Sequence, residues 1–165
     1  MFIAAGILTL VSPSCTVSLS GASIPAELKT INVEYFENNA PLVVNYLSQQ
    51  FTEALKDRIR STTRLSIVQG EATANLSGTI TGYSIEPVSV QATNNNVAPI
   101  AGAERLTITI NATYTNIADK KYNFTQSFTA YADFTGDIAS QEQKLIANIN
   151  KQLIEDIFNK AFANW

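Results

Sequence analysis

The chain has 165 residues, the size of one domain with a substantial core. Its net charge is −3, which argues against nonspecific binding to nucleic acid. It contains no histidine, which excludes Ser-His-Asp and Cys-His catalysis and removes the commonest transition-metal ligand. None of its seven glycines opens a helix after a strand, so no phosphate-binding loop is predicted and no cofactor is expected.

The single cysteine, Cys15, follows a short apolar run and three small residues. This order is typical of a bacterial lipoprotein signal peptide, in which the chain is cut before the cysteine and the sulfur is acylated. We therefore expect a signal peptide over 1–14, a lipid-anchored tether over 15–29 and one domain over 30–165. No basic residue precedes Lys29, so the signal peptide is expected to be incomplete. The alternative is an N-terminal strand or loop with a buried free cysteine.

Periodicity then predicts three elements up to residue 68. Alternating apolar residues predict a strand over Thr30–Phe36, with Ile31, Val33 and Tyr35 on one face. Pro41 suits a first helical turn, and apolar residues recurring at three and four predict a helix over 41–61. A short strand is expected over 64–68. The apolar stripe of the helix consists of Val44, Leu47, Phe51, Leu55 and Ile59.

The next segment predicts a long strand over 74–90. The alternation changes phase at Gly82, which predicts a β-bulge there. Pro87 indicates an edge position or the end of pairing. Residues 91–103 have no periodicity and predict a long loop, which is either functional or a tolerated insertion.

Two further strands are predicted over 105–115 and 122–133, joined by a turn over 117–121. Each strand carries apolar residues on one side and hydroxyl or amide residues on the other, so one face is core and the other is solvated or faces a partner. The polar residues are Thr107, Thr109, Asn111, Thr113 and Thr115 on the first strand and Asn123, Thr125, Ser127 and Thr129 on the second.

The chain closes with a second amphipathic helix. Residues 133–137 break the last strand, and Ser140 with Gln143 predicts a capping box that starts a helix reaching almost to Trp165. The order is β-α-β-β-β-β-α. It predicts an α+β fold in which two amphipathic helices pack on one face of a mostly antiparallel, four- to five-stranded sheet.

Several stretches, in chain order, carry a resemblance to a known family. They are GASIP at 21–25, YFENNAP at 35–41, LSQQFTEAL at 47–55, GYS at 82–84, YADF at 131–134 and DIFN at 156–159. Together they resemble the LptE family, the lipopolysaccharide-assembly lipoproteins of the Gram-negative outer membrane. The resemblance covers almost the whole chain from Cys15 onward.

The resemblance implies a specific role. LptE proteins place two helices on a four-stranded sheet and are anchored by an acylated cysteine in the periplasmic leaflet of the outer membrane. They plug and support the LptD β-barrel, contact lipopolysaccharide and are not enzymes. A barrel lumen is polar, so the polar strand residues are candidate contacts. The candidate barrel contacts are Thr107, Thr109, Asn111 and Thr125.

Lipopolysaccharide is anionic, so cations near strand ends are its natural contacts. The candidates are Arg64, Arg105, Lys120 and Lys121; the alternative is that they only solubilise turns. Two other functions stay open. One is an auxiliary binding lipoprotein of another transport complex. The other is an enzyme that uses carboxylates in apparent turns, namely Asp119, Asp133 and Asp137.

Overall fold

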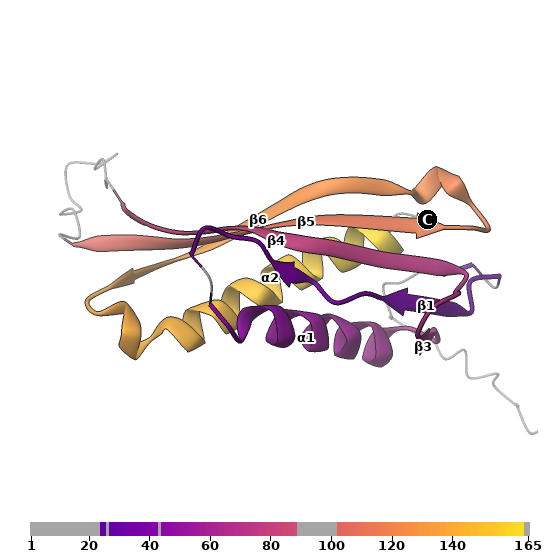
Figure 1. Cartoon of the computed structure of the whole chain (residues 1–165), viewed down its shortest axis with the longest axis horizontal. Helices are drawn as coiled ribbons and strands as arrows, with labels where there is room; N and C mark the ends of the chain where they lie inside the picture. Colours follow the sequence, from indigo (N-terminus) through magenta and orange to yellow (C-terminus); the bar gives the residue numbers. More distant parts are fainter. Residues whose placement is uncertain (1–23, 26, 43, 89–101, 164–165) are drawn as a thin grey trace, which may run out of the picture.

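The computed structural model describes residues 24–25, 27–42, 44–88 and 102–163. Two helices cover one face of a sheet, so the predicted α+β fold is confirmed (Figure 1). Within the described residues the sheet has six strands, more than predicted because the first predicted strand is split in two. The strands are β1 (Thr30–Val33), β2 (Glu37–Asn38), β3 (Ser66–Val68), β4 (Ala74–Pro87), β5 (Ala103–Asn116) and β6 (Phe124–Thr135). The helices are α1 (Leu47–Thr62) and α2 (Glu142–Phe162), with short 3-10 turns η1 (Lys120–Tyr122) and η2 (Ile138–Ser140).

The strand order is β3-β1-β4-β5-β6, with β2 also paired to β4. The long pairings of β4 with β5 and of β5 with β6 are antiparallel, whereas the short pairings of β1, β2 and β3 are parallel. The register between β4 and β5 shifts between Ile80 and Gly82, which leaves Thr81 as the extra residue. The bulge predicted at Gly82 is therefore confirmed, and β4 ends at Pro87.

The two helices lie side by side and run in the same direction (Figure 1). Near their starts, the hydroxyl of Tyr46 donates to Glu142 Oε2 at 3.4 Å. Further along, Arg58 donates to Glu155 Oε2 at 2.9 Å. The interval from Tyr46 to Arg58 is nearly the same as the interval from Glu142 to Glu155, as two parallel helices require. Within the described residues, no helix has the length and apolar character needed to cross a membrane.

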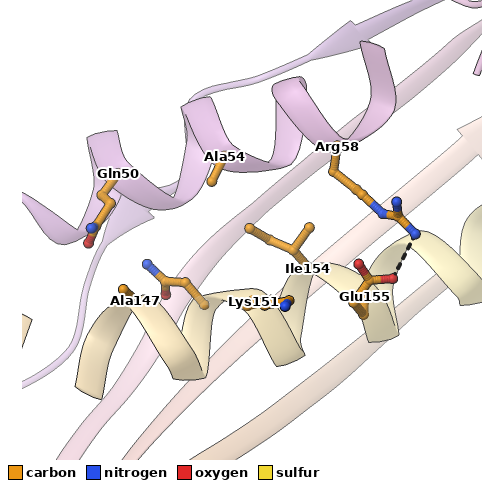
Figure 2. Close-up of a pocket in the computed structure, with 8 residues that line it drawn as sticks. Gln50, Ala54, Arg58, Ala147, Lys151, Ile154 and Glu155 are labelled. Atoms are coloured by element: carbon orange, nitrogen blue, oxygen red, sulfur yellow. Dashed lines mark hydrogen bonds and ion pairs between the residues drawn. The ribbon is translucent and has the colours of Figure 1, made fainter. Parts of the chain in front are cut away.

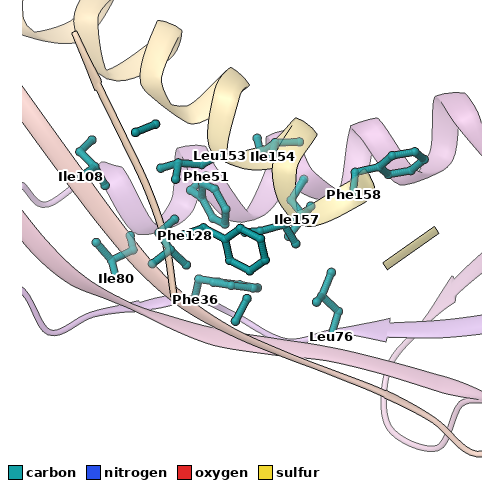
Figure 3. Close-up of a cluster of buried hydrophobic side chains, with 14 of the residues drawn as sticks. Phe36, Phe51, Leu76, Ile80, Ile108, Phe128, Leu153, Ile154, Ile157 and Phe158 are labelled. Carbon is teal, nitrogen blue, oxygen red and sulfur yellow. The ribbon is translucent and has the colours of Figure 1, made fainter. Parts of the chain in front are cut away.

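The core fills the space between the helices and the sheet (Figure 3). Phe36 is completely buried, and its ring centroid lies 5.1 Å from that of Phe51 on α1. Beneath it, Gly78 on β4 is paired with Ala112 on β5. A Cβ on Gly78 would meet the backbone carbonyl oxygen of Asn111 on β5 and lie 2.5 Å from Phe36 Cε1, so the glycine is required both by the neighbouring strand and by the packing of this ring.

The prediction for Tyr35 is wrong. Its side chain is 56% exposed, and Phe36 is buried in its place. The cause is a break in the strand after Val33, which shifts the alternation by one residue before β2 begins. The backbone N–H of Phe36, unpaired by a strand, donates to Thr52 Oγ1 on α1 at 3.1 Å.

The predicted start of the first helix is also wrong. β2 keeps the chain on the sheet edge, where the N–H of Asn39 donates to the carbonyl of Ile80 at 2.9 Å. The chain must turn off this edge before a helix can form, and the side chain of Asn38 caps the turn by accepting from the N–H of Ala40. Pro41 therefore lies in a bend, and α1 begins at Leu47.

The predicted capping box of the second helix does not form. Ser140 belongs to η2, where its hydroxyl donates to the carbonyl of Asp137 at 2.9 Å, and α2 begins at Glu142. Likewise η1 includes Tyr122, so β6 begins two residues later than predicted. Cys15 with the signal peptide, and the predicted loop up to residue 101, lie outside the described residues.

Replacing the glycine beneath Phe36 tests this packing. We expect Gly78→Ala to lower the free energy of unfolding by about 1–3 kcal/mol, because the new methyl forces Phe36 or its neighbours to shift. Urea denaturation followed by circular dichroism measures the change. Ser77→Ala, one residue away and facing the other side of the sheet, is the control. Equal stability of the two variants would contradict the packing.

Alkaline pH should weaken the fold through its tyrosines. Burial, and then a 2.7 Å hydrogen bond to Glu142, raises the pKa of Tyr83, and burial raises the pKa of Tyr114. A raised folded pKa gives stability that is fully present below the unfolded value of about 10 and is lost as pH rises above it.

Urea denaturation across alkaline pH measures the effect. We expect a decline of the unfolding free energy above about pH 10 that is shallower in the Tyr83→Phe, Tyr114→Phe double variant. Tyr35→Phe, which alters an exposed ring, should leave the wild-type slope unchanged. Identical slopes in the wild type and the double variant would refute the assignment.

Candidate functional site: the polar face of the sheet

Strand alternation gives the three long strands two different faces. Apolar side chains point toward the helices, and hydroxyl and amide side chains point away from them. The register then places these polar residues side by side, with Thr109 opposite Thr129 and Asn111 opposite Ser127. We call this surface the polar face. It comprises Asn75, Ser77, Thr79 and Ser84 on β4, Thr107, Thr109, Asn111 and Thr113 on β5, and Thr125, Ser127 and Thr129 on β6.

Hydrogen bonds between strands order this face. Thr109 and Thr129 join their hydroxyls at 3.0 Å, and Thr113 and Thr125 do the same at 3.0 Å. Each hydroxyl can donate once and accept twice, so these pairs keep capacity for further bonds. The predicted barrel contacts Thr107, Thr109, Asn111 and Thr125 are therefore brought onto one continuous, uncharged and hydrogen-bonding surface.

The polar face extends onto the neighbouring strand β1 and the segment after it. Asn32 donates to Asn75 Oδ1 at 3.0 Å, and Asn75 in turn donates to Glu34 Oε1 at 2.7 Å. Beside them lies an open depression of about 380 Å³. The exposed Tyr35 belongs to its lining, so the break after β1 adds an aromatic ring to this surface. The rest of the lining is Glu34, Glu37, Ser77, Gly78, Thr79, Asn111 and Thr113.

One end of the polar face carries a fixed ion pair. Arg105 donates to both carboxylate oxygens of Asp133, from Nε at 2.6 Å and from a terminal nitrogen at 2.9 Å. Its guanidinium carbon also lies 3.7 Å from the ring centroid of Tyr131. The hydrogen bond from Arg105 holds the pKa of Asp133 below its usual range, so the carboxylate stays charged and balances the cation.

The four predicted cations do not form one cluster. Arg105 lies where β5 starts and β6 ends, whereas Lys120 and Lys121 lie in the turn that joins the other ends of these strands. Arg64 is at this turn end as well. It lies just before β3, which pairs with β1 at Ile31. Ile31 is in turn paired with Ala74 at the start of β4, and Ala74 is paired with Asn116, the last residue of β5.

The carboxylates of the enzyme alternative do not all lie together. Asp119 lies at the turn end, where its side chain accepts from the N–H of Lys121, whereas Asp133 and Asp137 lie in and just after the opposite end of β6. No group of three or more acidic or cysteine residues in the described part of the chain is placed to hold a metal ion.

Sequence reasoning missed Glu142. Its carboxylate accepts from the hydroxyls of Tyr83 on β4 and Tyr46 before α1, so it ties both helix starts to the sheet. A first-turn glutamate is a signal for a helix start, because the helix dipole favours it there, but no sequence pattern shows which hydroxyls it meets.

Two helices that support one face of a sheet, with a neutral polar surface on the other face, define an α+β domain. The sequence model of one family, LptE, described as "Lipopolysaccharide-assembly", matches residues 28–161. The chain therefore belongs to the LptE family, whose role is in lipopolysaccharide assembly. A comparison with curated proteins gives no match.

Solved structures with this fold include three lipoproteins or related chains. Rare lipoprotein B from Shewanella oneidensis has a TM-score of 0.51 at 10% identity, covering 80% of this chain and 90% of that one. Uncharacterized lipoprotein B from Nitrosomonas europaea has a TM-score of 0.52 at 12% identity, covering 79% of each chain. Protein XCC0632 from Xanthomonas campestris has a TM-score of 0.56 at 9% identity, covering 81% and 84%. At these identities the likeness shows the fold.

The polar face should contribute little to folding. We expect the Thr109→Ala, Thr129→Ala double variant to lose no more than about 1 kcal/mol of unfolding free energy, because exposed cross-strand pairs are weak. Ile110→Ala, on the buried face of the same strand, should lose about 2–5 kcal/mol. Chemical denaturation measures both. A large loss in the threonine variant would show that the face serves stability instead of binding.

Proposed function

We propose that this LptE-family chain is an outer-membrane lipoprotein that plugs and supports an LptD-type β-barrel during lipopolysaccharide transport to the cell surface. It is anchored on the periplasmic side through acylated Cys15, and it is not an enzyme. The single observation that carries the proposal is the polar face, a neutral surface of hydroxyls and amides across three strands.

This face suits the lumen of a barrel. The interior of a transmembrane barrel is polar, so a plug must offer hydrogen bonds over a broad area. Hydroxyls and amides do so at a lower desolvation cost than ionised groups, which lose much of their hydration when buried. Thr107, Thr109, Asn111 and Thr125 are the proposed barrel contacts.

The anionic part of lipopolysaccharide should meet the turn end of the sheet. Arg64, Lys120 and Lys121 lie there and form no ion pair within the described residues. Arg105 is different because Asp133 already neutralises it. The geometry therefore favours the turn-end cations over Arg105 as contacts for lipopolysaccharide phosphates.

Affinity purification tests the proposal. A C-terminal tag on the native, membrane-anchored chain should recover a barrel protein of the LptD type in equal amount, identified by mass spectrometry. Recovery of a different transport complex would favour the auxiliary-lipoprotein alternative. Recovery of no barrel would overturn the plug proposal.

Charge placed on the polar face should disrupt the complex. We expect the Thr109→Lys, Thr129→Lys double variant to recover at least about tenfold less barrel, because two ammonium groups would be buried without partners. Asp57→Lys, on the exposed surface of α1, is the control and should recover the wild-type amount. Equal recovery in all three proteins would mean that the polar face is not the barrel contact.

A further inference from the structure

A cleft of about 310 Å³ opens between α1 and α2 (Figure 2). It belongs to the helix layer, so it lies on the other side of the molecule from the polar face and takes no part in the function proposed above (Figure 1). Its size is at the lower end of the range of ligand sites. Its lining includes Gln50, Ala54 and Arg58 from α1 and Ala147, Asn150 and Glu155 from α2.

Buried polar atoms without partners gather in this cleft. Asn150 is only 3% exposed, yet neither Oδ1 nor Nδ2 of its side chain has a hydrogen-bond partner among the described residues. Gln50 Oε1 and Arg58 Nε are also buried and unpaired. Four of the six such atoms in the described part of the chain therefore belong to residues that line one cleft. Buried polar groups in folded proteins are nearly always paired, so this concentration points to a ligand.

The shape of the cleft is held by its neighbours. Ala54 and Ala147 have side chains too small to close the space between the helices (Figure 2). The ion pair of Arg58 with Glu155, at 2.9 Å, joins the helices at one end. The guanidinium of Arg58 also lies 4.7 Å from the ring centroid of Phe158, which fixes its orientation.

We propose that this cleft binds an extended polypeptide segment of another protein, with a main-chain peptide group paired to the carboxamide of Asn150. A carboxamide presents one donor and one acceptor side by side, as a peptide group does, so the two can form paired hydrogen bonds. Gln50 adds an acceptor and Arg58 Nε a donor for neighbouring peptide groups. The charge of Arg58 is balanced by Glu155, whereas Lys151, which also lines the cleft, forms no ion pair within the described residues and can donate to a peptide carbonyl.

The length of the cleft suits such a segment. Gln50 and Arg58 are separated by about 12 Å along α1, from the rise of an α-helix. An extended chain covers this distance in roughly four residues. The volume and the two alanines restrict these residues to small side chains.

The test uses acetyl-tetraalanine-amide as the probe and the full chain in detergent micelles, labelled with nitrogen-15. We expect titration of the peptide to shift the side-chain amide signals of Asn150 and Gln50 and the Nε–H signal of Arg58. Affinity should fall at least about tenfold in Ala147→Leu, which fills the cleft from an exposed position, and in Asn150→Leu, which removes the paired bonds. Asn148→Leu, on the exposed surface of the same helix, should bind as the wild type does.

A second probe tests the role of the peptide group. The same peptide with its amide nitrogens methylated cannot donate, so it should bind at least about tenfold more weakly. Three results would overturn the inference. The first is no signal shift at high peptide concentration, which would mean that the cleft holds only water. The second is equal affinity for the methylated and the unmethylated peptide. The third is equal signal shifts with glucose, which would indicate a sugar site.

Discussion

The two faces of this protein depend on one irregularity in the pairing of β4 with β5. Up to Ile80, the residues of β4 that face the helices are Leu76, Gly78 and Ile80. The extra residue Thr81 then shifts the pattern, so that Tyr83 takes the next inward position. Without this bulge the second half of β4 would turn Tyr83 and Ile85 to the polar face and Ser84 to the core. A continuous core under a continuous hydroxyl surface therefore requires the bulge.

The helix layer depends on a different set of contacts. Glu142 ties the start of α2 to Tyr83, close to the bulge, and the ion pair between Arg58 and Glu155 joins the two helices further along. Between these two points the helices are not fully packed, and Asn150 is buried there with unpaired atoms. The protein thus offers a broad neutral surface on the sheet and a narrow cleft between the helices, beside the buried amides of Gln50 and Asn150, and the two suit different partners.

Strongly periodic segments were predictable from the sequence. The alternation in β5 and β6 predicted the polar residues of these two strands except Asn123, which lies before β6, and the phase change at Gly82 predicted the bulge, because side-chain direction in a strand is fixed by a period of two. Segments governed by nonlocal contacts were not. Tyr35 and Phe36 exchanged places because a strand break brought Phe36 under α1, over a glycine on β4. The local signals at Pro41 and Ser140 also predicted wrong helix starts. The pairing of β2 with β4 delays the start of α1, and the 3-10 turn η2 delays the start of α2.

Some features of the candidate site were also predictable from the sequence, and others were not. The sequence identified Thr107, Thr109, Asn111 and Thr125 as surface residues, and it identified Arg105 as a cation at a strand end. Only the register between β5 and β6 shows that Asp133 neutralises Arg105. The cleft was not predictable, because Gln50 and Asn150 are far apart in sequence and each is unremarkable on its own helix.

Site-specific photocrosslinking in cells can show whether the polar face contacts the barrel. A photoreactive amino acid would replace Thr109 or Ser127 on the polar face, or Asp57 on the exposed surface of α1. We expect crosslinks to an LptD-type barrel from positions 109 and 127 and none from position 57. Crosslinks from position 57 alone would contradict it, because the helix layer would then face the barrel.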